Sequence, residues 1–242
     1  MKQQKIPQIE KKSLAQEVYF YLRNGILSGA LAPGTRLLES QIAAEMKVSR
    51  APVREALRSL EADRLIEFHV NQGSTVREMK PEEISEIYTA RYVIEGYLAT
   101  LAATRATPED LIRLKKTTMQ AVKAAESGNL EDTINADFET HRLIWEISGH
   151  KLFYDILLHL EIQIRLFMSL QAVLFANLFE SVKEHQDIYT AIASKDPDAT
   201  RRCIQHHIIE AGLMALGRTA PGNQDIFPFI LEDNNLGSNE RA

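Results

Sequence analysis

Apolar residues recur at spacings of three and four along most of this 242-residue sequence. That period places the apolar side chains on one face of an α-helix, and it does not fit an extended strand. Glycine and proline interrupt the pattern at intervals, and acidic residues often follow the prolines, as they do in the first turns of helices. We therefore expect a mostly α-helical chain built from several helices of ordinary length.

Residues 13–79 contain three predicted helices. The first begins after Ser13, a favourable N-cap, and ends near Gly29. Its predicted buried face consists of Leu14, Val18, Leu22 and Ile26, with Tyr21 beside them. A short helix over 39–46 follows, and a third helix is capped by Ser49. Pro52 lies in the first turn of that third helix, where a missing N–H removes no hydrogen bond.

A β-hairpin is predicted directly after these helices. Residues 66–70 and 74–77 are β-prone, and Asn71-Gln72-Gly73 between them is typical of a turn. Three helices followed by a hairpin is the order of a winged helix-turn-helix, which also needs only a few residues between its second and third helices. Residues 13–79 are expected to form such a domain, preceded by a flexible arm over residues 1–12.

The charges are divided unevenly between the two parts of the chain. Residues 1–80 hold 13 Lys and Arg against 9 Asp and Glu, whereas residues 81–242 hold 15 against 24. A basic first part can approach an anionic polymer, which would repel the acidic second part. The imbalance indicates that the two parts have different tasks.

The third predicted helix carries Arg50, Arg54 and Arg58 at a spacing of four, on the face opposite its apolar residues. A guanidinium can donate two hydrogen bonds to guanine in the major groove, and it can equally bind a phosphate. The alternative is a solvated charged face, which Glu55 and Glu61 on the same helix keep open. The short preceding helix and the hairpin favour DNA reading.

Residues 80–217 contain six further predicted helices. Their ranges are near 82–104, 108–127, 130–148, 151–174, 178–194 and 198–216. Thr107 and Asp196 precede prolines and are predicted caps. No glycine or proline marks the break near Ala176, so one long helix there is an alternative. Residues 218–242 are rich in Asn, Gly, Ser and acidic residues and are expected to form a mobile tail, although the apolar residues 227–231 could dock on the rest of the protein.

Four polar residues interrupt the apolar stripes of three of these helices: Asp137, His141, His185 and His207. Asp137 and His141 are four residues apart and are therefore neighbours on one helix face. A buried polar group without a partner costs about 1–3 kcal/mol. One divalent metal ion could satisfy all four residues at once. Alternatively, each is hydrogen-bonded separately within an ordinary core.

Arg91 lies on the apolar stripe of the helix near 82–104, so its guanidinium is predicted to point inward. It could bind the carboxylate of a small effector, or form an internal salt bridge with Glu95 one turn further on. Arg165 is a further candidate for the effector site. A metal-bound water could also make the site an enzyme, but we expect no additional inward Glu or Asp that could act as a general base.

The sequence contains one cysteine, Cys203, and no apolar run approaching the roughly 20 residues that span a bilayer. The polar start of the chain lacks the apolar segment of a signal peptide. We expect a cytoplasmic protein without membrane contact.

Part of residues 13–79 closely resembles the GntR family of bacterial transcription regulators. The resemblance depends on Gly29, Pro33, Gly34, Leu37, Glu39, Ala43, Val48, Ser49, Arg50, Pro52, Arg54, Glu55, Leu57, Gly73 and Val76. It implies that Arg50 and Arg54 reach bases or phosphates, that Ser49 and Ala51 lie near the DNA backbone, and that Gly73 and Gln72 take a wing tip into the minor groove. Lys47 and Arg64 stand where glycine is usual.

The second part resembles the FCD-type ligand domain that often follows this DNA reader. The matching residues are Asp137, His141, Glu184, His185, Ile188, Ala191, Ile192 and His207. The resemblance implies a helical bundle that holds a divalent metal, zinc or nickel, on Asp137, His141, His185 and His207. The register selects His207 over His206. Family effectors are small carboxylates such as sugar acids, hydroxy acids, amino acids and fatty acids.

These features together predict a ligand-responsive transcription regulator, a repressor that a small organic acid releases from DNA. A single reader covers one half-site, so a homodimer on a pseudo-palindromic operator is expected. One alternative is a second domain that only dimerises, with a structural metal. Another is a metal-dependent enzyme.

Overall fold

The computed structural model describes residues 13–70, 73–169 and 175–216. The predicted arm over 1–12, the turn residue Gln72 and the predicted tail over 218–242 lie outside these ranges. The chain divides into two compact units between Glu78 and Met79, and we describe each by itself. Among the described residues, no helix combines the length and the apolar character that crossing a membrane requires.

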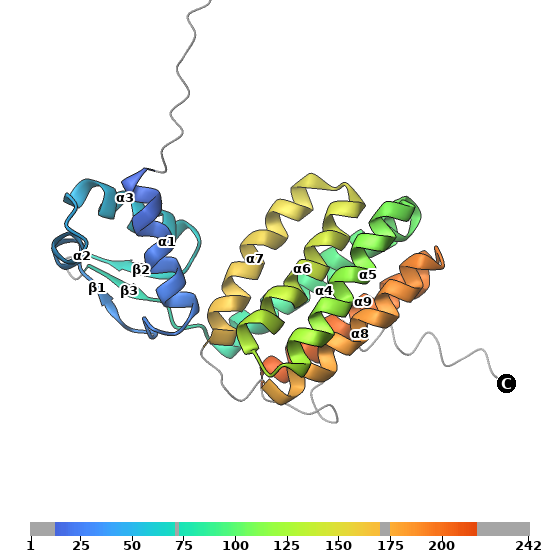
Figure 1. The fold of residues 1–242 in the computed structure, drawn as a ribbon. Helices are drawn as coiled ribbons and strands as arrows, with labels where there is room; N and C mark the ends of the chain where they lie inside the picture. The colour runs from blue at the N-terminus through green and yellow to red at the C-terminus, as the bar shows by residue number, and fades with distance from the viewer. Residues whose placement is uncertain (1–12, 71–72, 170–174, 217–242) are drawn as a thin grey trace, which may run out of the picture. The chain divides into compact units, whose positions relative to one another are not determined.

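The first unit is a winged helix-turn-helix, as predicted. Its helices are α1 (Leu14–Leu27), α2 (Glu39–Glu45) and α3 (Arg50–Ala62), and its strands are β1 (Arg36–Leu37), β2 (Ile66–His69) and β3 (Gly73–Val76). The three strands form one antiparallel sheet in the order β1-β3-β2 (Figure 1). The sequence did not predict β1, because two residues carry no measurable period and depend on pairing with β3.

The buried face of α1 differs from the predicted stripe. Leu14 is 55% exposed and Tyr21 is also exposed, whereas Ala15 is buried together with Val18, Leu22 and Ile26. On a helix with 3.6 residues per turn, side chains four positions apart differ in direction by about 40° around the helix axis. The three such steps from Leu14 to Ile26 therefore add up to about 120°. Ala15 restores the 3.6 period. The prediction that placed Leu14 and Tyr21 against the core was wrong.

Two turns of the first unit hold residues in the left-handed backbone conformation. Lys47, between α2 and α3, has φ 53°, and Arg64, between α3 and β2, has φ 56°. These are the two positions where the family resemblance expects glycine. A side chain with a Cβ is disfavoured there, so both turns are strained by the residues that occupy them.

Replacing Lys47 or Arg64 with glycine is therefore expected to raise the free energy of unfolding by about 0.5–1 kcal/mol. The left-handed conformation costs an L-residue about 1–2 kcal/mol, and the extra chain entropy of glycine offsets about half of that gain. Denaturant unfolding of the full chain, followed by circular dichroism, measures the change. The control is Arg58→Gly within α3, which should lower the same quantity by about 1 kcal/mol. Equal destabilisation by all three substitutions would contradict the assignment of strain.

The second unit is a bundle of six described helices, as predicted. They are α4 (Pro81–Arg105), α5 (Pro108–Glu126), α6 (Leu130–Ser148), α7 (Lys151–Ser169), α8 (Phe175–Ala193) and α9 (Pro197–Ala215). Helix α4 packs against α6 and α9, and α5 packs against α6 and α8 (Figure 1). Helices α7 and α8 are separate elements, and the residues between them lie outside the described ranges.

Local capping explains why these helices begin and end where the sequence predicted. The side chains of Thr107 and Asp196 accept the hydrogen bonds of Asp110 N and Ala199 N at the starts of α5 and α9. Gly149 ends α6 with φ 68°. By contrast, Ser49 occupies the N-cap position of α3 without a capping hydrogen bond from its side chain.

The centre of the bundle has a tight contact between α4 and α9. A Cβ added at Gly96 of α4 would lie 2.7 Å from Nε2 of Gln205 on α9. A larger residue at position 96 would therefore require the Gln205 side chain to move. Glu95 and His207, which are one and two positions away from this contact, are both buried.

Candidate functional site

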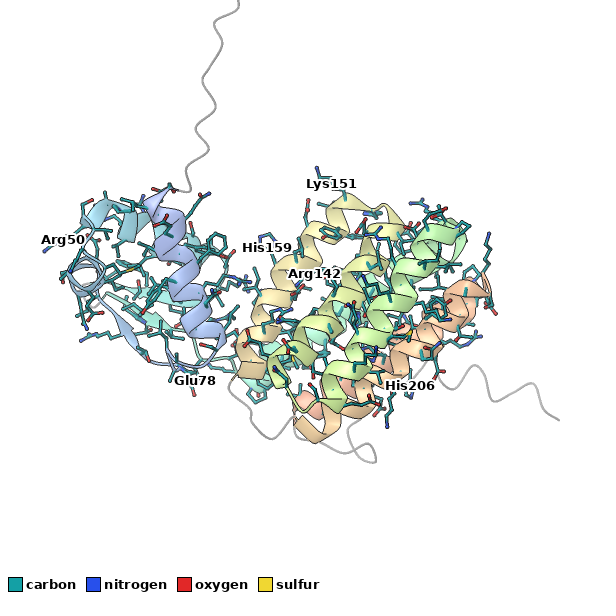
Figure 2. The ribbon with its side chains drawn as sticks, viewed as in Figure 1. Arg50, Glu78, Arg142, Lys151, His159 and His206 are labelled. Atoms are coloured by element: carbon teal, nitrogen blue, oxygen red, sulfur yellow. The ribbon has the colours of Figure 1, made fainter. Side chains whose placement is uncertain are left out.

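The exposed face of α3 carries the residues that the sequence assigned to DNA. Arg50, Arg54 and Arg58 are all exposed, as are Ser49 and Ala51 where the helix begins. Arg50 projects into solvent (Figure 2). The opposite face of α3 is buried, so the helix is fixed on one side and presents three guanidinium groups on the other.

Arg54 has a partner that the sequence analysis missed. Its Nε and Nη2 donate to the two carboxylate oxygens of Glu39 at 2.9 and 2.8 Å. This hydrogen bonding by Arg54 holds the pKa of Glu39 below its ordinary value. The Arg54 side chain remains 59% exposed, so Glu39 orients Arg54 without covering it. No periodic pattern links the two residues, which are 15 positions apart.

Gly73 opens β3 with φ 85°, and a Cβ there would lie 3.1 Å from a methyl group of Leu38. Both the backbone angle and the close contact favour glycine at this end of the hairpin. Gln72, the predicted wing-tip residue beside it, lies outside the described residues.

The four polar residues of the second unit converge at one place. Asp137 and His141 come from α6, His185 from α8 and His207 from α9, and all four are buried. One ligand atom of each lies within 4.8 Å of the others. His141 Nε2 is 3.0 Å from His207 Nε2, and His185 Nε2 is 3.4 Å from Asp137 Oδ1. We call these four residues the His/Asp cluster.

Within the described part of the chain, the polar atoms of this cluster are not all satisfied by protein groups. Asp137 Oδ1 and both ring nitrogens of His185 are buried without a hydrogen-bond partner. Burial lowers the pKa of His185 and of His207 well below the ordinary value of histidine. Neutral imidazoles offer lone pairs, and a carboxylate offers an oxygen, so the cluster has the donor set of a divalent metal site.

Two glutamates hold the outer nitrogens of the cluster histidines. Nδ1 of His141 is 2.7 Å from Glu95 Oε2, and Nδ1 of His207 is 2.9 Å from Glu184 Oε2. A carboxylate at Nδ1 keeps the proton there and leaves the Nε2 lone pair facing the cluster, which is the usual arrangement around metal-binding histidines. Glu95 is a further inward carboxylate, 1% exposed, and its oxygens are already held by Arg91, His141 and Trp145.

Glu95 contacts three side chains at once. Besides His141, it accepts hydrogen bonds from Arg91 Nε at 2.5 Å and from Trp145 Nε1 at 2.9 Å. Burial opposes ionisation, but Arg91 and His141 outweigh it and hold the pKa of Glu95 far below its ordinary value. The carboxylate is therefore charged. Its salt bridge with Arg91 is one of the two alternatives that the sequence left open for Arg91.

The salt bridge leaves Arg91 with an unused donor. Arg91 is 4% exposed, and its Nη2 has no hydrogen-bond partner among the described residues. Arg91, Asp137 and His207 line a cavity of about 40 Å³. The internal salt bridge and the binding of an effector carboxylate are therefore both compatible with the geometry of Arg91, because Nε binds Glu95 and Nη2 remains for a ligand.

Arg165, the second candidate for the effector site, and His206, the alternative to His207, do not line this cavity. Arg165 donates to Glu161 and to Asn135 and lies over the ring of Phe138 at 4.6 Å. His206 is 67% exposed and points out of the bundle (Figure 2).

Comparison with known proteins gives consistent matches along the chain. Residues 14–76 match the model described as bacterial regulatory proteins of the gntR family, and residues 86–210 match the FCD domain. The HTH-type transcriptional repressor RspR of Escherichia coli is 29% identical over 197 residues, which cover 81% of this chain and 86% of RspR. The gluconate operon transcriptional repressor of Bacillus subtilis is 39% identical over 90 residues, 37% of each chain. The solved structure of E. coli McbR/YncC has 26% identity and a TM-score of 0.73, covering 86% of this chain and 99% of that one.

Proposed function

Because the chain belongs to the GntR family of bacterial regulatory proteins and carries an FCD domain, we propose that it represses transcription until a small carboxylate binds beside a divalent metal in its second unit. It is a DNA-binding transcription regulator, like the relatives it matches, whose names describe regulators rather than enzymes. The proposal concerns the metal, the effector and the direction of the response.

The observation that carries the proposal is the set of unsatisfied buried atoms around the cavity. A divalent cation, zinc or nickel, fits Asp137, His141, His185 and His207, because they supply one carboxylate and three neutral imidazoles. Such an ion would offer coordination positions to an oxygen donor. Arg91 Nη2 supplies a charged hydrogen-bond donor at the same cavity. Together these groups suit a carboxylate.

The DNA contacts follow from the exposed face of α3. Arg50, Arg54 and Arg58 would enter the major groove, with Ser49 and Ala51 close to the DNA backbone. Gly73, with Gln72 beside it, would belong to the wing. One such reader covers a single half-site, so a symmetric homodimer on a pseudo-palindromic operator is proposed.

Helix α4 is the proposed link between the two activities. It begins at Pro81, just after the division between the units, and carries both Arg91 and Glu95. We assign residues 13–79 to DNA binding and residues 80–217 to effector binding and dimerisation. An effector changes DNA affinity only by favouring one arrangement of the readers over another. A ligand held by Arg91 acts on the helix that leads to the reader.

The test begins with an operator selected from random DNA by the full chain loaded with Ni²⁺. Addition of propionate, lactate, isovalerate or gluconate at millimolar concentration is expected to raise the operator Kd by about 5- to 150-fold for at least one of them. Arg91→Gln should keep operator affinity and lose that response. An operator affinity that no carboxylate changes would instead support a purely structural metal and dimerisation domain.

A further inference from the structure

The cavity beside the His/Asp cluster is lined by two chemically different kinds of side chain. Its polar lining residues are Tyr88, Arg91, Asp137, Ser181 and His207. Its other lining residues are Phe138, Ile164, Met168, Ala211, Met214 and Ala215. A ligand that fills this space therefore meets charged and polar groups as well as hydrocarbon and thioether groups.

The polar lining residues favour an anion. Arg91 Nη2 is a buried charged donor without a partner, and the neighbouring Glu95 is already held by Arg91 Nε, His141 and Trp145. A ligand carboxylate would give Nη2 the acceptor that the described residues do not provide. A ligand without an acceptor would leave that donor unsatisfied, which is costly in a buried place, and a neutral acceptor would form a weaker hydrogen bond than a carboxylate does.

The apolar lining residues disfavour hydroxyl groups. A hydroxyl buried against Phe138, Ile164, Met168 or Met214 loses its hydrogen bonds to water and meets no side-chain partner there stronger than a thioether sulfur, which is a weak acceptor. Each such group lowers affinity by about tenfold or more. A methyl or methylene group at the same place gains affinity by leaving water.

The dimensions of the cavity favour a compact molecule. Its volume of about 40 Å³ is a few times the roughly 10–15 Å³ that one water needs by the same kind of measure. Met168 and Met214 are unbranched and flexible, so they can adapt to tails of slightly different shape.

We propose that the effector is a short aliphatic monocarboxylate, whose carboxylate meets Arg91 and whose apolar tail lies against Phe138 and Met214. Polyhydroxylated sugar acids are excluded from the site. The inference rests on the proposed carboxylate function and narrows it to one chemical class.

The experiment compares three probes by isothermal titration calorimetry on the full chain loaded with Ni²⁺. Isovalerate and gluconate have the same charge, and 3-methylbutan-1-ol has the tail of isovalerate without its charge. Isovalerate is expected to bind at least about tenfold more tightly than either of the others. Gluconate binding as tightly as isovalerate would overturn the inference and leave the carboxylate function standing. Equal binding of the alcohol would overturn the role of Arg91.

A pair of methionine variants tests where the tail lies. Met214→Gln keeps the side-chain length and should weaken isovalerate binding by about threefold to tenfold, with the metal content unchanged. The matched control is Met119→Gln on α5, where the side chain is 50% exposed, and it should leave binding unchanged. Full affinity in Met214→Gln would overturn the placement of the tail. If metal-loaded protein binds neither carboxylate, both the inference and the proposed carboxylate response fail.

Discussion

The purified protein is expected to contain about one divalent metal ion per chain, and the double variant His185→Ala/His207→Ala to contain none. The reason is the buried donor set, in which Asp137 Oδ1 and the His185 nitrogens have no hydrogen-bond partner among the residues that the structure describes. Removing two of four ligands leaves too few for tight binding. Elemental mass spectrometry after loading and desalting measures the content. Wild-type protein without metal would mean that the His/Asp cluster only forms hydrogen bonds within an ordinary pocket.

A conservative variant of Glu95 tests whether this residue positions His141 for metal binding or only stabilises the folded protein. Glu95→Gln keeps the shape of the side chain but weakens its hold on His141, and should lower metal affinity by about 10- to 100-fold. Glu161→Gln is the matched control, because Glu161 is also buried and paired with Arg142 and Arg165 but does not contact the cluster. Competition with a chromophoric chelator measures both. Equal affinities would contradict the role of Glu95.

Arg54→Ala is expected to weaken operator binding by about 30- to 10,000-fold without unfolding the protein. One bidentate contact to a base contributes about 1–3 kcal/mol of discrimination, and a symmetric dimer makes it twice. Arg54 is exposed and donates its hydrogen bonds to the side chain of Glu39, so its loss should leave the circular dichroism spectrum unchanged. Fluorescence anisotropy at one fixed salt concentration measures the affinity, because phosphate contacts vary with salt.

The control for Arg54 is another exposed, paired arginine. Arg113 on α5 donates to both carboxylate oxygens of Glu146, much as Arg54 does to Glu39. Arg113→Ala removes the same charge and breaks a similar pair, yet it should leave operator affinity unchanged. Unchanged affinity in Arg54→Ala would remove α3 from the role of reading helix.

Most of the fold was predictable because its determinants are local. Proline after Thr107 and Asp196, and glycine at 149, set helix ends through contacts within a few residues. The periodic apolar stripes then identified the buried faces. Strand β1 escaped prediction because it exists only through its pairing with β3. The register of α1 was misassigned because Leu14 is apolar but lies off the 3.6-residue period.

The same difference between local determinants and tertiary contacts explains which parts of the site could be predicted from the sequence. Each residue of the His/Asp cluster interrupts an apolar stripe, which is visible along the sequence. Two of the three partners of Glu95, His141 and Trp145, are 46 and 50 positions away. Likewise, the hydrogen bonds between Arg54 and Glu39 join two different helices, α3 and α2. Periodicity shows which way a side chain points, but the partner on another helix is settled only by tertiary packing.

Glu95 has a consequence for how a cell would use this regulator. One carboxylate holds both the metal ligand His141 and the effector arginine Arg91, so under the proposed function neither input is read independently of the other. A bacterium starved of the metal would keep its operator occupied even when the organic acid is plentiful. The gene under control would then respond to the organic acid only in cells whose metal supply is adequate. A single protein would thus require both conditions before transcription begins.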